Sequence, residues 1–157
     1  AKSVWTGMLM LVWAGESLTS GGRYSPAPYG PDLDGDGHID CGQDCDDGDA
    51  QVWSSPLEVE HLVVTGGDPA NLNWDSQALP AGPGTLYQVA GGNLASQPGL
   101  DFNSTTCLQP SGANAFSDTR PDPPMGTGYW YLARATNACG LGTYGPAPRD
   151  LQITSCP

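Results

Sequence analysis

The chain has 157 residues and a formal net charge of −12, from seventeen acidic and five basic residues. Eight of the acids fall between residues 32 and 49, so the negative charge is local, and the lack of a basic patch argues against nucleic acid as a partner. Glycine and proline supply 37 residues, which favours many turns and few helices.

Residues 1–15 form an apolar N-terminal segment that is too short to span a bilayer. Ala1 fits the residue left after removal of a signal peptide. We expect residues 3–14 to form one β-strand, which either joins its own sandwich or is donated to a neighbouring copy. Donation is favoured because a long spacer and the acidic loop intervene. The predicted subunit interface comprises Val4, Trp5, Met8, Leu9, Met10, Leu11, Val12 and Trp13.

Residues 16–31 have the composition of an extended, flexible spacer, and residues 32–55 form an acidic loop. Within the loop, Asp32, Asp34, Asp36, Gly37 and Asp40 follow the spacing D-x-D-x-D-G-x-x-D of a calcium loop. In that spacing the seventh position, His38, supplies its backbone carbonyl. Gln43 stands where an EF-hand needs a bidentate acid, and no amphipathic helix flanks the loop, so an EF-hand is not expected.

The same stretch resembles a thrombospondin type 3 repeat and the related aspartate-rich loops of secreted bacterial proteins, over about residues 32 to 58. The resemblance implies a second set of ligands, and hence a second calcium ion, from Asp44, Asp46, Asp47, Asp49 and Glu58. It also implies a small disulfide between Cys41 and Cys45 that staples the loop. Two alternatives are a solvated acidic linker and a copper site. The copper site would use the soft or borderline candidates His38, His61, Met8 and Met10.

Residues 56–157 read as six or seven short strands separated by Gly/Pro-rich turns, which predicts an all-β sandwich of immunoglobulin-like type. The expected strands lie in VEHLVVTGGD, NLNWDS, TLYQVAGGNL, NAFSDT, GYWYLARATNACG and RDLQITSC. This region resembles a bacterial fibronectin type III module. The resemblance rests on Trp74 after Leu72, on Tyr87, and most strongly on the run from Asp118 to Gly145.

Five cysteines in a chain of this size favour an oxidising compartment, so we expect a secreted protein, extracellular or on the cell surface. In a fibronectin-like topology Cys107 and Cys139 fall at the same end of the sandwich, which pairs them. Cys156 is left over, and it could instead pair with Cys139, stay free or bond another chain. Asn103 begins an acceptor sequon for glycosylation.

No nucleophile elbow, P-loop, metalloprotease motif or paired catalytic carboxylates occur in the sequence, which predicts a protein that is not an enzyme. We therefore expect a secreted, calcium-stabilised structural protein, the subunit of a filament or surface assembly of copies of itself. The alternative is a non-catalytic binding or adhesin module with a glycan or cell-surface partner, or an accessory domain of a secreted protein.

Overall fold

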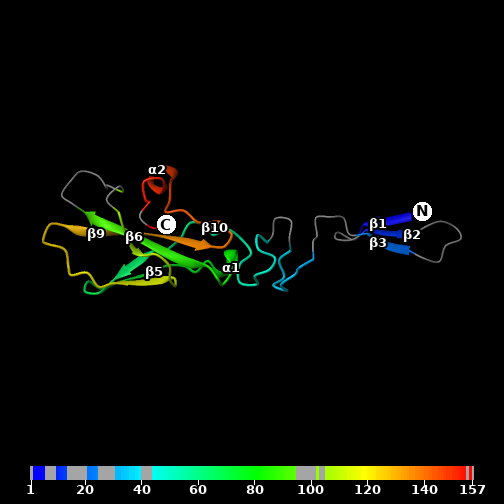
Figure 1. Cartoon of the computed structure of the whole chain (residues 1–157), viewed down its shortest axis with the longest axis horizontal. Coiled ribbons are helices and arrows are strands. Elements are labelled where there is room, and N and C mark those ends of the chain that lie inside the picture. The colour runs from blue at the N-terminus through cyan, green and yellow to red at the C-terminus, as the bar shows by residue number, and fades with distance from the viewer. Residues whose placement is uncertain are drawn as a thin grey trace.

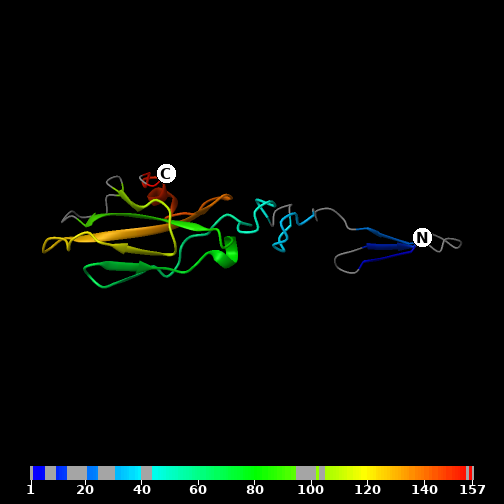
Figure 2. The same cartoon turned by 60° about the horizontal axis from the view of Figure 1, so that its bottom comes forward.

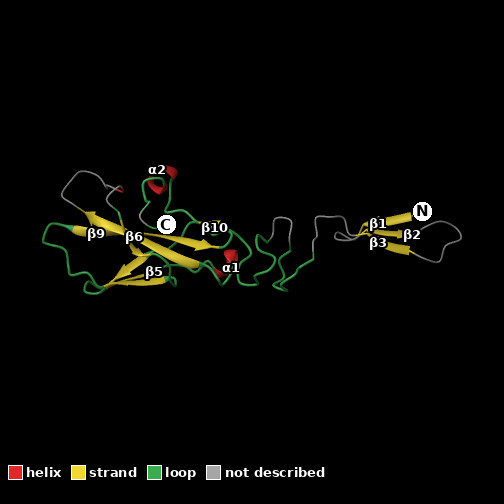
Figure 3. Ribbon diagram, in the orientation of Figure 1, coloured by secondary structure: helices red, strands yellow, loops and turns green. Residues whose placement is uncertain are grey.

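The computed structural model describes residues 2–5, 10–13, 21–24, 31–39, 44–94, 102, 105–154 and 156. Its elements are mostly β-strands, arranged in three antiparallel sheets (Figures 1 and 3). One of them is an N-terminal sheet in which β1 (Lys2–Trp5), β2 (Met10–Trp13) and β3 (Gly21–Tyr24) follow one another in space. In both views of the chain this sheet lies apart from the others, with the acidic loop between them (Figures 1 and 2).

The other two sheets pack face to face as a β-sandwich. One has the order β4-β5-β8, and the other has the order β10-β9-β6-β7. The strands are β4 (Val63–Thr65), β5 (Ala70–Asn73), β6 (Leu86–Leu94), β7 (Thr106–Gln109), β8 (Ala115–Asp118), β9 (Gly128–Asn137) and β10 (Gly140–Leu141). Two four-residue helices, α1 (Ala78–Ala81) and α2 (Ala147–Asp150), lie in connections.

The core between the sheets is formed by alternate side chains of β6 and β9. β6 and β9 pair over nine residues, from Leu86 opposite Thr136 to Leu94 opposite Gly128. Every second side chain of this pair faces β4-β5-β8, because strand side chains alternate between the two faces of a sheet. The buried members of the core are Leu72, Trp74, Tyr87, Val89, Ala133 and Ala135.

A second cluster covers the outer face of the β10-β9-β6-β7 sheet. It joins Ala90 of β6 to Tyr144, Ile153 and Cys156 from the C-terminal segment after β10. The buried Arg134 guanidinium donates to the side-chain oxygen of Gln88 and to the Cys156 carbonyl, and it lies 4.7 Å from the centre of the Tyr144 ring. The C-terminal segment is thus a third layer.

The expected all-β sandwich is confirmed, with three differences in its parts. First, residues 3–14 do not form one strand, because β1 and β2 pair as a hairpin with Lys2 opposite Trp13. Second, β3 lies inside the segment expected to be a flexible spacer. Third, the final strand expected in RDLQITSC is wrong, since the short helix α2 and a turn occupy residues 147–152. A continuous apolar run gives no signal for where a strand must turn, which explains the first difference.

Candidate metal site

The acidic loop brings three of the predicted ligands together. Carboxylate oxygens of Asp32, Asp34 and Asp36 lie within 4.8 Å of one another, so this cluster could bind a metal ion. The turn is built locally, as the backbone N–H groups of Gly35 and Gly37 donate to the two oxygens of Asp32 at 2.6 and 3.1 Å. Both glycines have positive φ angles, 79° and 92°, a conformation that side chains with a Cβ rarely adopt.

Asp44 interacts electrostatically with this cluster. Burial raises the pKa of the Asp34 carboxyl, and the charges of Asp36, Asp44 and Asp32 raise it further, while a backbone hydrogen bond from Asp36 lowers it. Asp44 is 7% exposed. Its Oδ2 atom is buried without a hydrogen-bond partner, as are the Oδ2 atoms of Asp34 and Asp36. Three buried carboxylate oxygens without donors are costly unless a cation compensates them.

The remaining predicted ligands have other partners or lie outside the described residues. Asp47 accepts the backbone N–H of Leu33 at 3.1 Å, which ties the two halves of the loop together. Asp49 accepts the N–H of Gln51, and Asp46 is an exposed side chain. Glu58 is not brought to the cluster, since its Oε1 lies 3.7 Å from the Arg149 guanidinium. Asp40 and Cys41 lie outside the described residues.

The two histidines considered for copper are not brought together. The His38 ring stacks on the indole of Trp53 at 4.5 Å with an interplanar angle of 12°. His61 Nδ1 lies 2.8 Å from Asp75 Oδ2, and this hydrogen bond raises the pKa of His61. Met8 lies outside the described residues, as do Leu9 and the sequon residue Asn103. Among the residues described, the three-aspartate cluster is the only group of acids, histidines or cysteines close enough to share an ion.

The loop is fastened to one end of the sandwich. Cys45 forms a disulfide with Cys139, just beyond β9, with a Cα–Cα distance of 5.6 Å. The Asn137 side chain donates to the carbonyls of Ser54 and Ala81 at 2.8 and 3.1 Å. Beneath the loop, a Cβ on Gly82 would lie 2.2 Å from the Gln51 carbonyl, so only glycine permits this close approach. The loop is therefore held to the sandwich at several points.

Both predicted disulfide pairings are corrected. The structure pairs Cys45 with Cys139, not with Cys41, and pairs Cys107 with Cys156 at a Cα–Cα distance of 4.9 Å. Cys107 lies on β7, and the C-terminal segment crosses the outer face to reach it. Sequence reasoning missed this because it placed Cys156 at the end of a last strand. Both Cα–Cα distances lie in the range usual for disulfides.

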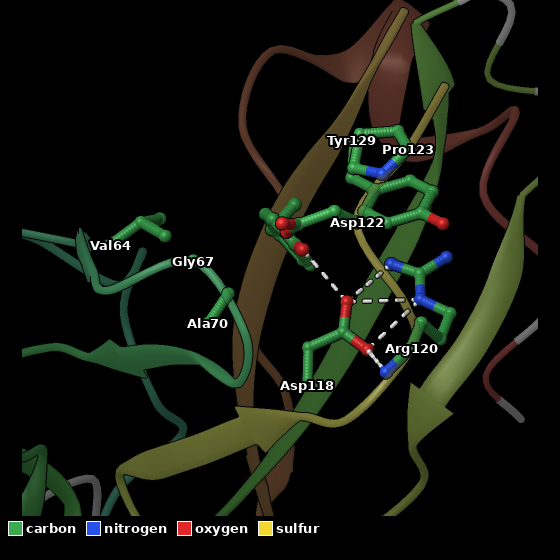
Figure 4. A pocket seen from close by; sticks show the side chains of 9 residues that line it. Val64, Gly67, Ala70, Asp118, Arg120, Asp122, Pro123 and Tyr129 are labelled. Carbon is green, nitrogen blue, oxygen red and sulfur yellow. Dashed lines mark hydrogen bonds and ion pairs between the residues drawn. The ribbon is translucent and has the colours of Figure 1, made fainter. Parts of the chain in front are cut away.

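A second polar cluster stabilises the end of the sandwich away from the loop. Asp118, at the end of β8, is 3% exposed and accepts hydrogen bonds from the Arg120 guanidinium at 2.7–3.0 Å and from the Tyr131 hydroxyl at 2.7 Å (Figure 4). Burial raises the pKa of the Asp118 carboxyl, but the bonds from Arg120 and Tyr131 outweigh it and lower the pKa to about 2. Arg120 also covers the Tyr129 ring, at 4.0 Å from its centre.

No protein-family model matches the chain, and no curated protein matches its sequence. Among the described residues no helix has the length and apolarity needed to cross a membrane.

Proposed function

We propose that this chain is an extracellular structural subunit in which calcium stiffens the junction between an N-terminal assembly segment and a fibronectin type III-like sandwich. The observation that carries the metal proposal is the set of buried, unpartnered Oδ2 atoms on Asp34, Asp36 and Asp44. Asp32, Asp34 and Asp36 would hold the ion, with Asp44 as a further ligand. Oxygen-only donors favour calcium over transition metals.

Calcium would act here through folding. It would neutralise carboxylates that repel one another, so binding and ordering of the loop should be coupled. Within the acidic loop the His38 ring stacks on Trp53, and the disulfide between Cys45 and Cys139 attaches the loop to the sandwich. A rigid loop would fix the direction in which the N-terminal sheet leaves the sandwich. The two disulfides fit the oxidising compartment that this proposal requires.

Calorimetric titration of the full chain with calcium tests the site. We expect binding to be lost or weakened at least about tenfold in Asp34→Asn and Asp36→Asn, because each removes a charged ligand. Asp122→Asn, an exposed acid outside the loop, is the matched control and should bind as the parent does. The stoichiometry also counts the ions, since a second one is a separate prediction that involves Asp46 and Asp49. Equal affinity for calcium in all three variants would show that the aspartate cluster is not the calcium site.

The assembly half of the proposal rests on the N-terminal sheet. Its three strands have four residues each, which is close to the smallest sheet that can be stable on its own in water. The sequence of β2 is apolar throughout, β1 adds Val4 and Trp5, and Val4 is 54% exposed. Contact with a second copy would cover such a surface. The partners that this proposal requires are copies of the same chain.

A non-catalytic binding module is the second candidate. It is favoured by two cavities of about 190 and 370 Å³ that share Pro123 and Tyr129 at the far end of the sandwich. A glycan could stack on an aromatic ring in such a place. Sedimentation of the full chain separates the two candidates, since a binding module stays monomeric at high concentration and a structural subunit does not.

A further inference from the structure

One edge of the long strand β9 is open over half its length. On one side β6 pairs with β9 from Gly128 to Thr136. On the other side β10 pairs only with Thr136 and Asn137, and Glu58 forms an isolated bridge with Arg134. Within the described part of the chain, no strand or bridge pairs with this edge between residues 128 and 133. The cause is that the chain leaves the sheet after β10 and crosses the outer face.

The open edge borders a groove whose lining is mostly apolar and includes the Asp118–Arg120 ion pair. The smaller of the two cavities is lined by Tyr129 and Tyr131 of β9, by Val64 of β4, and by Asp122 and Pro123. Figure 4 shows Asp122 between Val64 and Tyr129. β4 is itself an edge strand, and its Val64 is 48% exposed. A strand laid along β9 would therefore gain backbone hydrogen bonds from one sheet and apolar contacts from both.

Charge points to the occupant of this groove. Each of the three arginines of the sandwich has a partner within it. Arg120 pairs with Asp118. Arg134 donates to the Gln88 side chain and the Cys156 carbonyl, and Arg149 lies beside Glu58. The remaining cations, Lys2 and Arg23, lie in β1 and β3. Residues 1–31 hold these two cations and one acid, a net charge of +1, whereas residues 32–157 hold three arginines and sixteen acids, a net charge of −13. Asp122, which lines the groove, is an exposed acid.

We propose that the open edge of β9, residues 128–133, accepts strand β1 of a second copy of this chain. β1 is an outer strand of its sheet, so it can pair without disturbing the hairpin, and its four residues suit the open span. β3, the other outer strand, begins with two glycines, which weaken a strand. The 119–127 loop beside the groove and the N-terminal sheet lie at opposite ends of the chain (Figure 1). Such a head-to-tail contact does not close on itself and builds a filament.

This inference rests on the proposed self-assembly and adds its acceptor site. Lys2 is the sole lysine of the chain, so a carbodiimide-coupled peptide joined through a lysine side chain reports on the neighbours of Lys2. Isotope-labelled and unlabelled full-length protein are mixed, coupled and digested. We expect mixed-isotope peptides that join Lys2 to Asp122. Peptides that join Lys2 only to acids of residues 32–49 would overturn the proposal, since the acidic loop would then be the partner.

Two variants and a control complete the test. Asp122→Lys and Val64→Lys should raise the concentration at which half of the chains are assembled by about tenfold or more, because they place repulsive charge in the groove. Glu60→Lys makes the same charge change as Asp122→Lys at an exposed site outside the groove and should assemble like the parent. Normal assembly of both groove variants refutes the acceptor site but leaves self-assembly standing. If the parent itself stays monomeric, the proposed function fails as well.

Discussion

Replacing the buried carboxylate Asp118 by Asn should destabilise the sandwich at neutral pH and have little effect in acid. The pKa of Asp118 falls from an ordinary 3.8 to about 2 in the folded chain. A group whose folded pKa is lowered contributes stability above its unfolded pKa and loses it as the pH falls through the folded value. The downward shift of the pKa contributes about 2.4 kcal/mol to the free energy of unfolding at pH 7, about 1.3 kcal/mol at pH 3 and about 0.4 kcal/mol at pH 2.

Urea unfolding of the parent and of Asp118→Asn between pH 7 and pH 2 measures this directly. Each pair of curves gives a difference in the free energy of unfolding, which should shrink by about 2 kcal/mol across the series. Asp122→Asn is the control, because that carboxyl is exposed. Tyr131→Phe removes one donor to Asp118 and should show part of the same pH dependence. A difference that stays constant from pH 7 to pH 2 would refute the assignment of the stabilisation to the ionised carboxylate.

Three further predictions concern packing and the disulfides. Gly92→Ala should lower the free energy of unfolding by about 1–3 kcal/mol in a denaturant titration, because its Cβ would lie 2.8 Å from the Trp130 indole; an unchanged midpoint would contradict this contact. Gly82→Ala should speed proteolysis of the acidic loop, since its Cβ would meet the Gln51 carbonyl, and an unchanged cleavage rate would show that the loop is not seated there. A non-reduced digest should contain two linked pairs, Cys45–Cys139 and Cys107–Cys156, and a Cys107–Cys139 peptide would count against this fold.

The strands of the sandwich could be predicted because their sequences carry the signal. The alternation from Tyr129 to Ala135, between Gly/Pro-rich turns, is typical of a strand with two distinct faces, and β9 lies there. Likewise, the alternate aspartates and glycines from Asp32 to Gly37 impose a local turn that needs no distant contact. The cluster of Asp32, Asp34 and Asp36 follows from that turn.

The features that the sequence did not reveal depend on contacts between distant segments. Leu151 and Ile153 alternate as strand residues do, yet the chain turns there to cover the outer face, and Ile153 joins Tyr144 in the second buried cluster. The disulfides follow from this path, so spacing alone could not pair Cys107 with Cys156. Glu58 matches a ligand position in the repeat but lies beside Arg149, because its backbone bridges to β9.

Negative-stain electron microscopy of the full-length protein, in calcium and in excess chelator at the same concentration, tests the central claim most directly. The claim is that calcium orders the acidic loop so that copies of the chain can join end to end. We predict extended polymers in calcium and short or dispersed particles in chelator. Monodisperse single particles under both conditions would contradict the claim.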